Sequence, residues 1–162
     1  MTRTRSEYRL DQLDDLPAAP TLDRLTLRPP VDDDRSQLAG LLLDAYRGTI
    51  DDEGEDGDDA LAAIDEYRER IQRDWSVVAE DAGRPVAMCF VVEVDGIRYV
   101  DPIAVAPSHK RRGLGGDLVL TVLHRLHEAG TERVGAVITD GNTPSQRLFT
   151  GLGFVRVGSW GS

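Results

Sequence analysis

A glycine-rich loop at residues 110–116 carries the residue types whose chemistry is easiest to interpret. It follows an apolar segment, residues 103–107, and leads into a segment with helical apolar spacing that we expect to begin near Asp117. Unpaired N–H groups and roughly half a positive charge at a helix start attract anions. Glycines let the main chain approach a ligand closely, and three basic residues open the loop. The pattern therefore predicts a polyphosphate site.

Two common phosphate motifs do not fit this loop. A P-loop ends in Gly-Lys-Ser/Thr, and no such lysine is present. The dinucleotide fingerprint G-x-G-x-x-G, counted from Gly113 and Gly115, would need a third glycine where Leu118 stands. A nucleotide-phosphate binder of either kind is thus disfavoured.

The loop resembles the signature of the GNAT superfamily of acyl-CoA-dependent N-acyltransferases, Q/R-x-x-G-x-G/A after a strand ending in V-x-P. Val105-Ala106-Pro107 matches the lead-in and residues 110–115 match the loop, with Lys110 in place of the usual Gln or Arg. A second family block, N-x-x-A/S-x-x-L-Y/F-x-x-x-G-F, is similar to residues 142–154. The resemblance covers about residues 25–157. It implies transfer of an acyl group, most simply acetyl from acetyl-CoA, to a primary amine of a small molecule or a protein, with no metal.

The same resemblance assigns the cofactor end of the site. The backbone of residues 103–105 is expected to pair with the pantetheine arm, and the amides of residues 111–116 to hold the pyrophosphate. Pro102, which cannot donate to a strand ladder, fits a place where two strands splay to admit that arm. Asn142 is expected to contact pantetheine or to orient the acceptor, although a simple turn role explains it almost as well. The expected cofactor residues are Ile103, Ala104, Val105, Lys110, Arg111, Arg112, Gly113, Leu114, Gly115, Gly116, Asn142 and Phe149.

Transfer to an amine needs a proton acceptor, because an amine with a pKa near 10.4 is neutral in roughly one molecule per thousand at pH 7. We expect Asp101, just before the strand that would hold the thioester, to be this base, with Glu93 on the neighbouring strand as the substitute. The alternative role for Asp101 is that of an ordinary solvent-facing strand residue. The backbone N–H of Val105 is expected to stabilise the oxyanion.

The departing thiolate needs a proton donor. In many GNAT relatives a tyrosine on the last helix supplies it, but Phe149 stands at the matching position and has no hydroxyl. Ser145, one helical turn earlier, is the expected substitute, although a small packing residue explains it better. The alternative to an enzyme is therefore a catalytically silent acyl-CoA-binding sensor.

An acidic stretch at residues 51–59 lies between the first two helices, where this superfamily places its acceptor wall. Asp52, Glu53 and Glu55 are the expected binders of a cationic acceptor. A solvated acidic loop explains the same residues at least as well. The identity of the amine is not encoded in any pattern that we recognise.

The elements that must position these residues follow from periodicity. Residues 25–28, 76–80, 86–94, 97–106, 133–139 and 154–157 indicate strands, and the Asp95-Gly96 pair indicates a hairpin turn. Helices are expected after Asp32 to Asp34, after the acidic stretch, after the glycine loop, and from a T-x-x-Q capping box with Thr143 as the cap. The order β-α-α-β-β-β-α-β-α-β predicts a single α/β domain, GNAT-like, with a mixed, mostly antiparallel sheet flanked by helices. We assign residues 1–20 to a flexible arm and residues 21–162 to this domain.

Composition narrows the remaining classes. The chain has 162 residues and a formal net charge of −10, which disfavours nucleic-acid binding. Neither a membrane span nor the apolar stretch of a secretory signal is evident, so a cytoplasmic protein is expected. The single cysteine, Cys89, sits in an apolar strand and is expected in the core, and His124 and His127 are expected at the surface without a metal. The sequence is compatible with either a monomer or a homodimer.

Overall fold

The computed structural model describes residues 4–22 and 24–161, so residues 1–3 of the predicted N-terminal arm lie outside the described residues. The strands are β1 (Arg5–Leu10), β2 (Thr26–Arg28), β3 (Val77–Asp81), β4 (Arg84–Val94), β5 (Ile97–Val105), β6 (Val134–Thr139) and β7 (Val155–Trp160). The helices are α1 (Arg35–Tyr46), α2 (Gly57–Arg70), α3 (Leu114–Glu128) and α4 (Thr143–Gly151), with two short 3-10 turns, η1 (Asp32–Asp34) and η2 (Pro107–His109). The predicted α/β fold with a mixed, mostly antiparallel sheet is confirmed.

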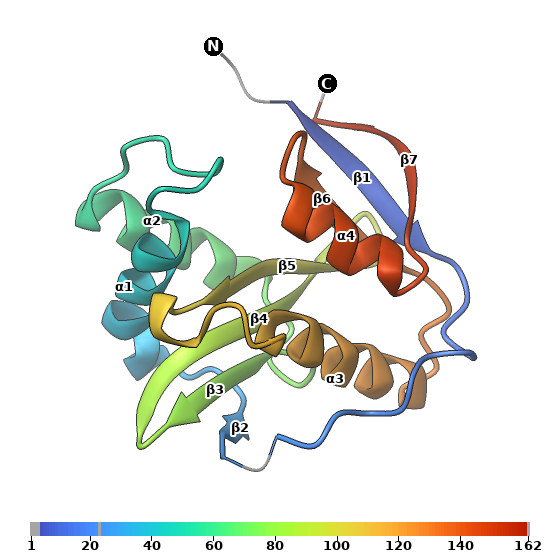
Figure 1. Cartoon of the computed structure of the whole chain (residues 1–162), viewed down its shortest axis with the longest axis horizontal. Helices are drawn as coiled ribbons and strands as arrows, with labels where there is room; N and C mark the ends of the chain where they lie inside the picture. Colours follow the sequence, from blue (N-terminus) through green and yellow to red (C-terminus); the bar gives the residue numbers. More distant parts are fainter. Residues whose placement is uncertain (1–3, 23, 162) are drawn as a thin grey trace.

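One seven-stranded sheet, in the order β2-β3-β4-β5-β6-β1-β7, separates two layers of helices (Figure 1). Side chains that alternate along a strand point to opposite faces. Val77 and Cys89 join a core cluster with α3 and Phe149, whereas Val78 and Met88 join a second cluster with α1 and α2. The sheet is therefore buried on both faces, which explains the nearly continuous apolar runs in β3 and β4.

The N-terminal residues correct the sequence analysis. The expected loosely held arm is wrong for β1, which pairs antiparallel with β6 on one side and β7 on the other. Tyr8 and Leu10 enter the core below it, and the strand's backbone groups are paired on both edges. The alternation of Ser6, Tyr8 and Leu10 as inward residues was the available signal. This strand also places Arg5 beside Thr139 at the end of β6.

Two helix starts differ from the predictions. Asn142, not Thr143, caps α4, because its side-chain oxygen accepts the Ser145 N–H at 3.3 Å while Thr143 already belongs to the helix. The third helix begins at Leu114 rather than near Asp117, because Gly113 adopts a left-handed conformation (φ 74°) and turns the chain directly into the helix. Both shifts place more of the motif residues at a helix N-terminus than the sequence analysis expected.

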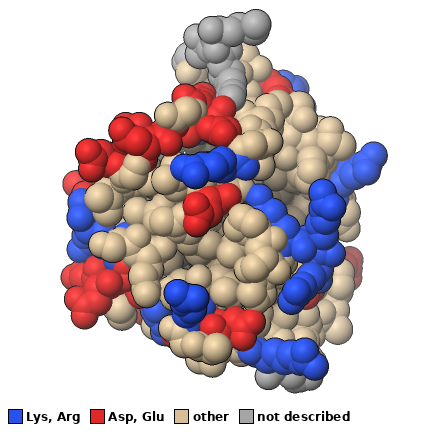
Figure 2. Space-filling view, turned by 60° about the vertical axis from the view of Figure 1, so that its left-hand side comes forward, with Lys and Arg blue, Asp and Glu red and all other residues tan. Residues whose placement is uncertain are grey.

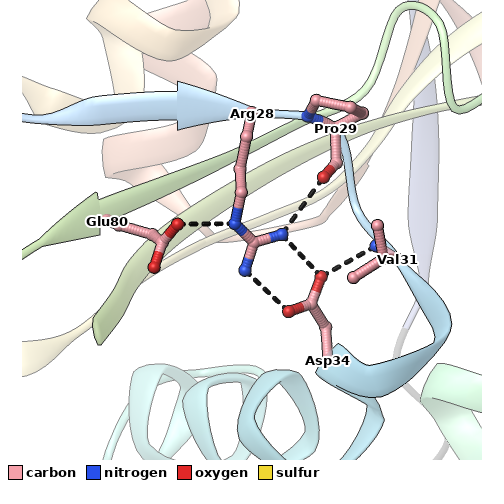
Figure 3. Close-up of polar contacts among 5 residues, drawn as sticks. All are labelled: Arg28, Pro29, Val31, Asp34 and Glu80. Atoms are coloured by element: carbon pink, nitrogen blue, oxygen red, sulfur yellow. Dashed lines mark hydrogen bonds and ion pairs between the residues drawn. The ribbon is translucent and has the colours of Figure 1, made fainter. Parts of the chain in front are cut away.

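A closed ion network fixes the start of α1 at the far edge of the sheet. Arg28 on β2 binds both oxygens of Asp34 at 2.7 and 2.8 Å, and its Nε donates to Glu80 on β3 (Figure 3). Asp34 also accepts the N–H of Val31 at 2.8 Å. Burial would raise the pKa of Asp34, but these hydrogen bonds and the arginine charge lower it overall.

Among the described residues, no helix is both long enough and apolar enough to cross a membrane.

Candidate active site

The site begins where two parallel strands separate. β5 and β6 are in register at Arg98–Val134 and Tyr99–Gly135, and this register ends there, although β5 runs on to Val105. Pro102 lies in the separating part of β5 and has no N–H to donate. The predicted splay at this proline is thus confirmed. Between the separating strands lies a cavity of about 960 Å³ that also reaches α1, α2, α4 and the glycine loop.

One edge of β5 is left facing this cavity. Residues Ile103 to Val105 pair with β4 on their other edge, opposite Cys89, Met88 and Ala87. The next N–H, that of Ala106, donates to Val86 on β4 at 2.8 Å. Because successive N–H groups of a strand point to opposite edges, the N–H of Val105 points toward the splay. The strand therefore offers a free row of main-chain groups to an extended ligand.

The glycine loop forms one end of the cavity. The N–H of Asp117 makes the first bond inside α3, to the carbonyl of Gly113 at 3.0 Å. The amides of Leu114, Gly115 and Gly116 precede it and so have no acceptor within the helix. All four residues from Gly113 to Gly116 line the cavity. This end is suited to an anion.

The three basic residues of the loop differ in their surroundings. Lys110 lines the cavity, but its ammonium donates to the carbonyl of Ala45 at the end of α1. Arg111 lines the cavity and has φ 66°, an uncommon value for a residue with a side chain. Arg112 is exposed and is not part of the cavity wall. Lys110 thus anchors the loop to α1, and Arg111 is the cation best placed to meet a ligand.

Asp101 lies in the cavity wall, half-buried, at the start of the splay. Burial raises the pKa of this carboxyl to about 6, Arg5 opposes the rise, and the charge of Asp51 adds to it. A carboxylate with this pKa is ionised at neutral pH and is still basic enough to take up a proton. The structure places the predicted base where such chemistry is possible.

The substitute base, Glu93, is not brought to the site. Its side chain is exposed on β4, opposite Arg98, and does not line the cavity. Adjacent residues of a strand face opposite ways, and the sequence did not indicate which face of β4 would look toward the cavity.

The acidic stretch also contributes to the cavity wall. Glu53 and Glu55 line it as predicted, together with Asp59 at the start of α2. Asp52 does not, because its carboxylate accepts the N–H groups of Gly48 and Gly54, each at 2.9 Å, and shapes the turn. Figure 2 shows how charge is divided on the face that carries α1 and α2, with acidic side chains gathered at its upper left and basic ones along its right edge.

Asp51 is a cavity residue that the sequence analysis missed. Its carboxylate accepts the Thr139 hydroxyl at 2.6 Å and the Asn142 side-chain amide at 3.1 Å. Asn142 is therefore both a helix cap and a partner of Asp51, which satisfies much of its hydrogen-bonding capacity within the protein. Only the neighbouring members of the acidic stretch had been singled out, because nothing in the sequence distinguishes Asp51 from them.

Arg5, Tyr46 and Tyr67 were also missed as cavity residues. Tyr46 comes from α1 and Tyr67 from α2. Burial raises the pKa of each above its usual value, and the charge of Asp101 adds to both shifts, so their hydroxyls stay protonated at neutral pH. Arg5 comes from the strand that was assigned to a flexible arm.

The predicted acid side contains Ser145 and Phe149, which both line the cavity. Phe149 is buried and packs edge-on against Phe154, with ring centres 5.0 Å apart. Ser145 is half-buried one turn earlier on α4. Position 149 therefore contributes a packed phenylalanine ring to the core and no hydroxyl to the cavity.

Three other predictions concern residues away from the cavity. Cys89 is fully buried in the core, and burial raises the pKa of its thiol, which agrees with the predicted packing role. His124 and His127 lie on α3 beside the segment after β1, where they contact the Pro17 carbonyl and the Asp14 carboxylate. Among the described residues, no group of three or more His, Cys, Asp or Glu side chains is arranged to hold a metal.

Comparison with known proteins agrees with this geometry. Residues 38–154 match the model of the acetyltransferase (GNAT) family. No protein of curated function matches the chain.

Several solved structures share the fold at low sequence identity. A GCN5-related N-acetyltransferase from Sphaerobacter thermophilus has a TM-score of 0.73 at 19% identity, and the match covers 97% of this chain and 49% of that one. PH1933 from Pyrococcus horikoshii OT3 has a TM-score of 0.69 at 18% identity, with 85% and 92% covered. The protein yncA of Salmonella typhimurium, solved with its cofactor acetyl-CoA, has a TM-score of 0.59 at 22% identity, with 80% and 78% covered. The chain thus spans about half the length of the Sphaerobacter protein.

Proposed function

Since the chain belongs to the acetyltransferase (GNAT) family, we propose that it transfers an acetyl group from acetyl-CoA to a primary amine of a small molecule or a protein. One observation carries this proposal. The splay between β5 and β6 opens a cavity with an anion-suited helix start in one part of its wall and a half-buried carboxylate, Asp101, in another.

The cofactor end is supported by main-chain geometry. The pantetheine arm would pair with the open edge of β5 at residues 103–105, as an added strand does. The pyrophosphate would accept hydrogen bonds from the amides of Leu114, Gly115 and Gly116, with Arg111 supplying a cation. Lys110 would act indirectly, since its hydrogen bond to Ala45 holds the loop in place.

The chemistry at the other end rests on Asp101. An amine that enters as an ammonium ion gives a proton to the Asp101 carboxylate, and its lone pair then attacks the thioester carbonyl carbon. The N–H of Val105 points toward the splay and is suited to the oxyanion that develops there. The adduct then carries a positive nitrogen and an oxyanion. As the oxyanion collapses, the C–S bond breaks, the nitrogen gives up its remaining extra proton, and the thiolate of coenzyme A takes up a proton, so that the products are the neutral amide and the free thiol.

Among the steps of the proposed reaction, protonation of the leaving thiolate has the least structural support. Ser145 has a hydroxyl in the cavity wall and is the proposed donor, directly or through water. A thiolate is a good leaving group, so a weak donor slows turnover rather than preventing it. Phe149, which replaces a tyrosine hydroxyl with a packed ring, favours a second candidate function, an acetyl-CoA sensor without catalysis.

The acceptor end is strongly acidic. Asp51, Glu53, Glu55 and Asp59 line the same cavity as Asp101, and the charge of Arg5 acts on the Asp101 carboxylate. Such a wall favours a cationic amine over an anionic one by long-range attraction.

Calorimetric titration with acetyl-CoA, followed by measurement of thiol release across a panel of amines, tests the proposal. Tight binding with amine-dependent thiol release is the expected result. Binding without any amine-dependent release would identify the sensor instead, and absence of binding would refute both functions. Asp44→Asn, an exposed change on α1, is the matched control for carboxylate substitutions in the cavity.

A further inference from the structure

Asp51 is the point at which the acidic loop is attached to the rest of the site. The loop between α1 and α2 crosses beside the ends of β6 and α4. There, Thr139 at the end of β6 donates to one Asp51 oxygen at 2.6 Å, and Asn142 donates to the other at 3.1 Å. Asn142 simultaneously caps α4 through Ser145. One carboxylate thus joins the loop to the strand and the helix that wall the cavity.

The same carboxylate lines the cavity together with the group proposed as the base, and its charge acts on that group. Several titratable groups surround Asp101, namely Arg5 from β1, Tyr46 from α1, Tyr67 from α2, Cys89 from β4 and Asp51 from the loop. The two phenols and the thiol are neutral at physiological pH. Within the part of the chain that the structure describes, Arg5 and Asp51 are therefore the two charges that act on Asp101, and they act in opposite directions.

We propose that Asp51 is a positioning residue of the acetyl-transfer site, which pins the acidic loop across the cavity and places a second negative charge in the same cavity wall as Asp101. This inference rests on the proposed function. The acceptor amine would be received as a cation between two carboxylates and would then lose its proton to Asp101. The role of Asp51 is to hold the loop in place, because its two oxygens are bonded to Thr139 and Asn142.

Two substitutions separate the hydrogen bonds of Asp51 from its charge. In Asp51→Asn, the new amide oxygen can accept from Asn142, and the new NH2 group can donate to the Thr139 hydroxyl, which is able to reverse its role. The loop attachment is then kept while the charge is lost. Asp51→Ala removes both. Asp58→Asn, an exposed residue in the first turn of α2, removes one charge near the same loop without touching the cavity wall and is the matched control.

For Asp51→Asn we expect the acid limb of the kcat/KM profile to move to lower pH by about 0.5 to 1 on the pH scale, because removing a nearby like charge makes Asp101 easier to ionise. KM for the amine should rise about 3- to 10-fold, since each 1.4 kcal/mol of lost attraction is about tenfold in affinity. Affinity for acetyl-CoA should not change. Asp51→Ala should raise the amine KM further, and Asp58→Asn should resemble the wild type.

An NMR titration of the Asp101 carboxyl carbon makes the test independent of turnover. If the wild type transfers no acetyl group, the proposed function fails, but the titration still decides whether the charge of Asp51 acts on Asp101. An Asp101 titration that is the same in wild type, Asp51→Asn and Asp58→Asn would overturn the inference. So would an amine KM in Asp51→Asn equal to that of the wild type.

Discussion

Two regions of this molecule contain an arginine and two carboxylates in opposite arrangements. At the edge of the sheet, Arg28 binds Asp34 through two hydrogen bonds and Glu80 through a third (Figure 3). In the cavity, Asp101 and Asp51 lie near Arg5, which acts on Asp101 through its charge alone. The pKa of Asp34 is lowered and that of Asp101 is raised to about 6.

The difference shows what burial does to a carboxylate with and without a bonded partner. A partnered carboxylate is held as a charge and contributes to the fold, since removing its arginine would leave an uncompensated buried charge. A buried carboxylate without such a partner makes the folded state less stable but gains an affinity for protons. The first arrangement stabilises α1, and the second supplies the chemical capacity of the cavity. The predictions below test this contrast.

The largest effect is expected from Asp101→Asn. Loss of the proposed base should lower kcat/KM at pH 8 by about 10²- to 10⁴-fold. The free energy of unfolding at that pH should rise by about 3 kcal/mol, because a pKa raised from 3.8 to about 6 makes the ionised group destabilising. Enzyme assays and urea unfolding measure the two effects. An active variant, or one less stable than the wild type, would contradict the contrast.

Arg28→Met should lower the stability of the protein and leave its cavity functional, which is the reverse of the pattern expected for Asp101→Asn. It leaves Asp34 buried beside no cation, and breaking a buried ion pair from one side costs about 3 kcal/mol of unfolding free energy. The protein that remains folded should bind acetyl-CoA as the wild type does. Urea unfolding and calorimetry measure these outcomes. The control is Arg70→Met, whose side chain is 59% exposed and lies 4.0 Å from Glu66, and which should change stability by less than about 0.5 kcal/mol.

The pH dependence of stability should separate the two carboxylates. Asp101 has a folded pKa above its unfolded value, so its penalty is present at high pH and is relieved as pH falls through about 6 toward 4. The advantage of Asp101→Asn over the wild type should shrink from about 3 kcal/mol at pH 8 to about 0.5 kcal/mol near pH 4. Asp34 has a lowered pKa, so its stabilisation is present above its unfolded pKa and is lost as pH falls through the folded one. Unfolding curves from pH 8 to 4 measure the Asp101 trend, and curves continued below pH 4 measure the Asp34 trend. A constant difference between wild type and Asp101→Asn from pH 8 to 4 would argue against a raised pKa.

The smallest effect is expected at the glycine loop, where affinity rests on main-chain geometry rather than on a fixed charge. Gly113→Ala forces a side chain into a left-handed conformation (φ 74°) and should weaken acetyl-CoA binding about fivefold, because that conformation costs about 1 kcal/mol. The new Cβ meets no atom within 4 Å, so the effect is conformational. Gly40→Ala, on α1 and also free of contacts, is the control and should leave binding unchanged.

Most of the fold could be predicted because periodicity and turn residues are local signals. The strands from β2 to β7 and all four helices were expected in the correct order, and the left-handed Asp95 and Gly96 form the predicted hairpin turn. β1 was missed, although its alternation was present, because proline-rich polar sequence follows it and its partners β6 and β7 lie more than a hundred residues away. The cap of α4 was misplaced by one residue because Asn142 and Thr143 are both good caps.

The sequence by itself determined the glycine loop, the proline at the splay and the choice of Asp101, since each depends on residue type and spacing along one segment. Only the tertiary structure decided which acidic residues face the cavity, that Glu93 does not, and that Arg5 does. The orientation of a strand face and the meeting of distant segments depend on packing across the sheet, which no local pattern encodes. The raised pKa of Asp101 has the same origin, because it comes mainly from burial beneath elements that are far apart in the chain.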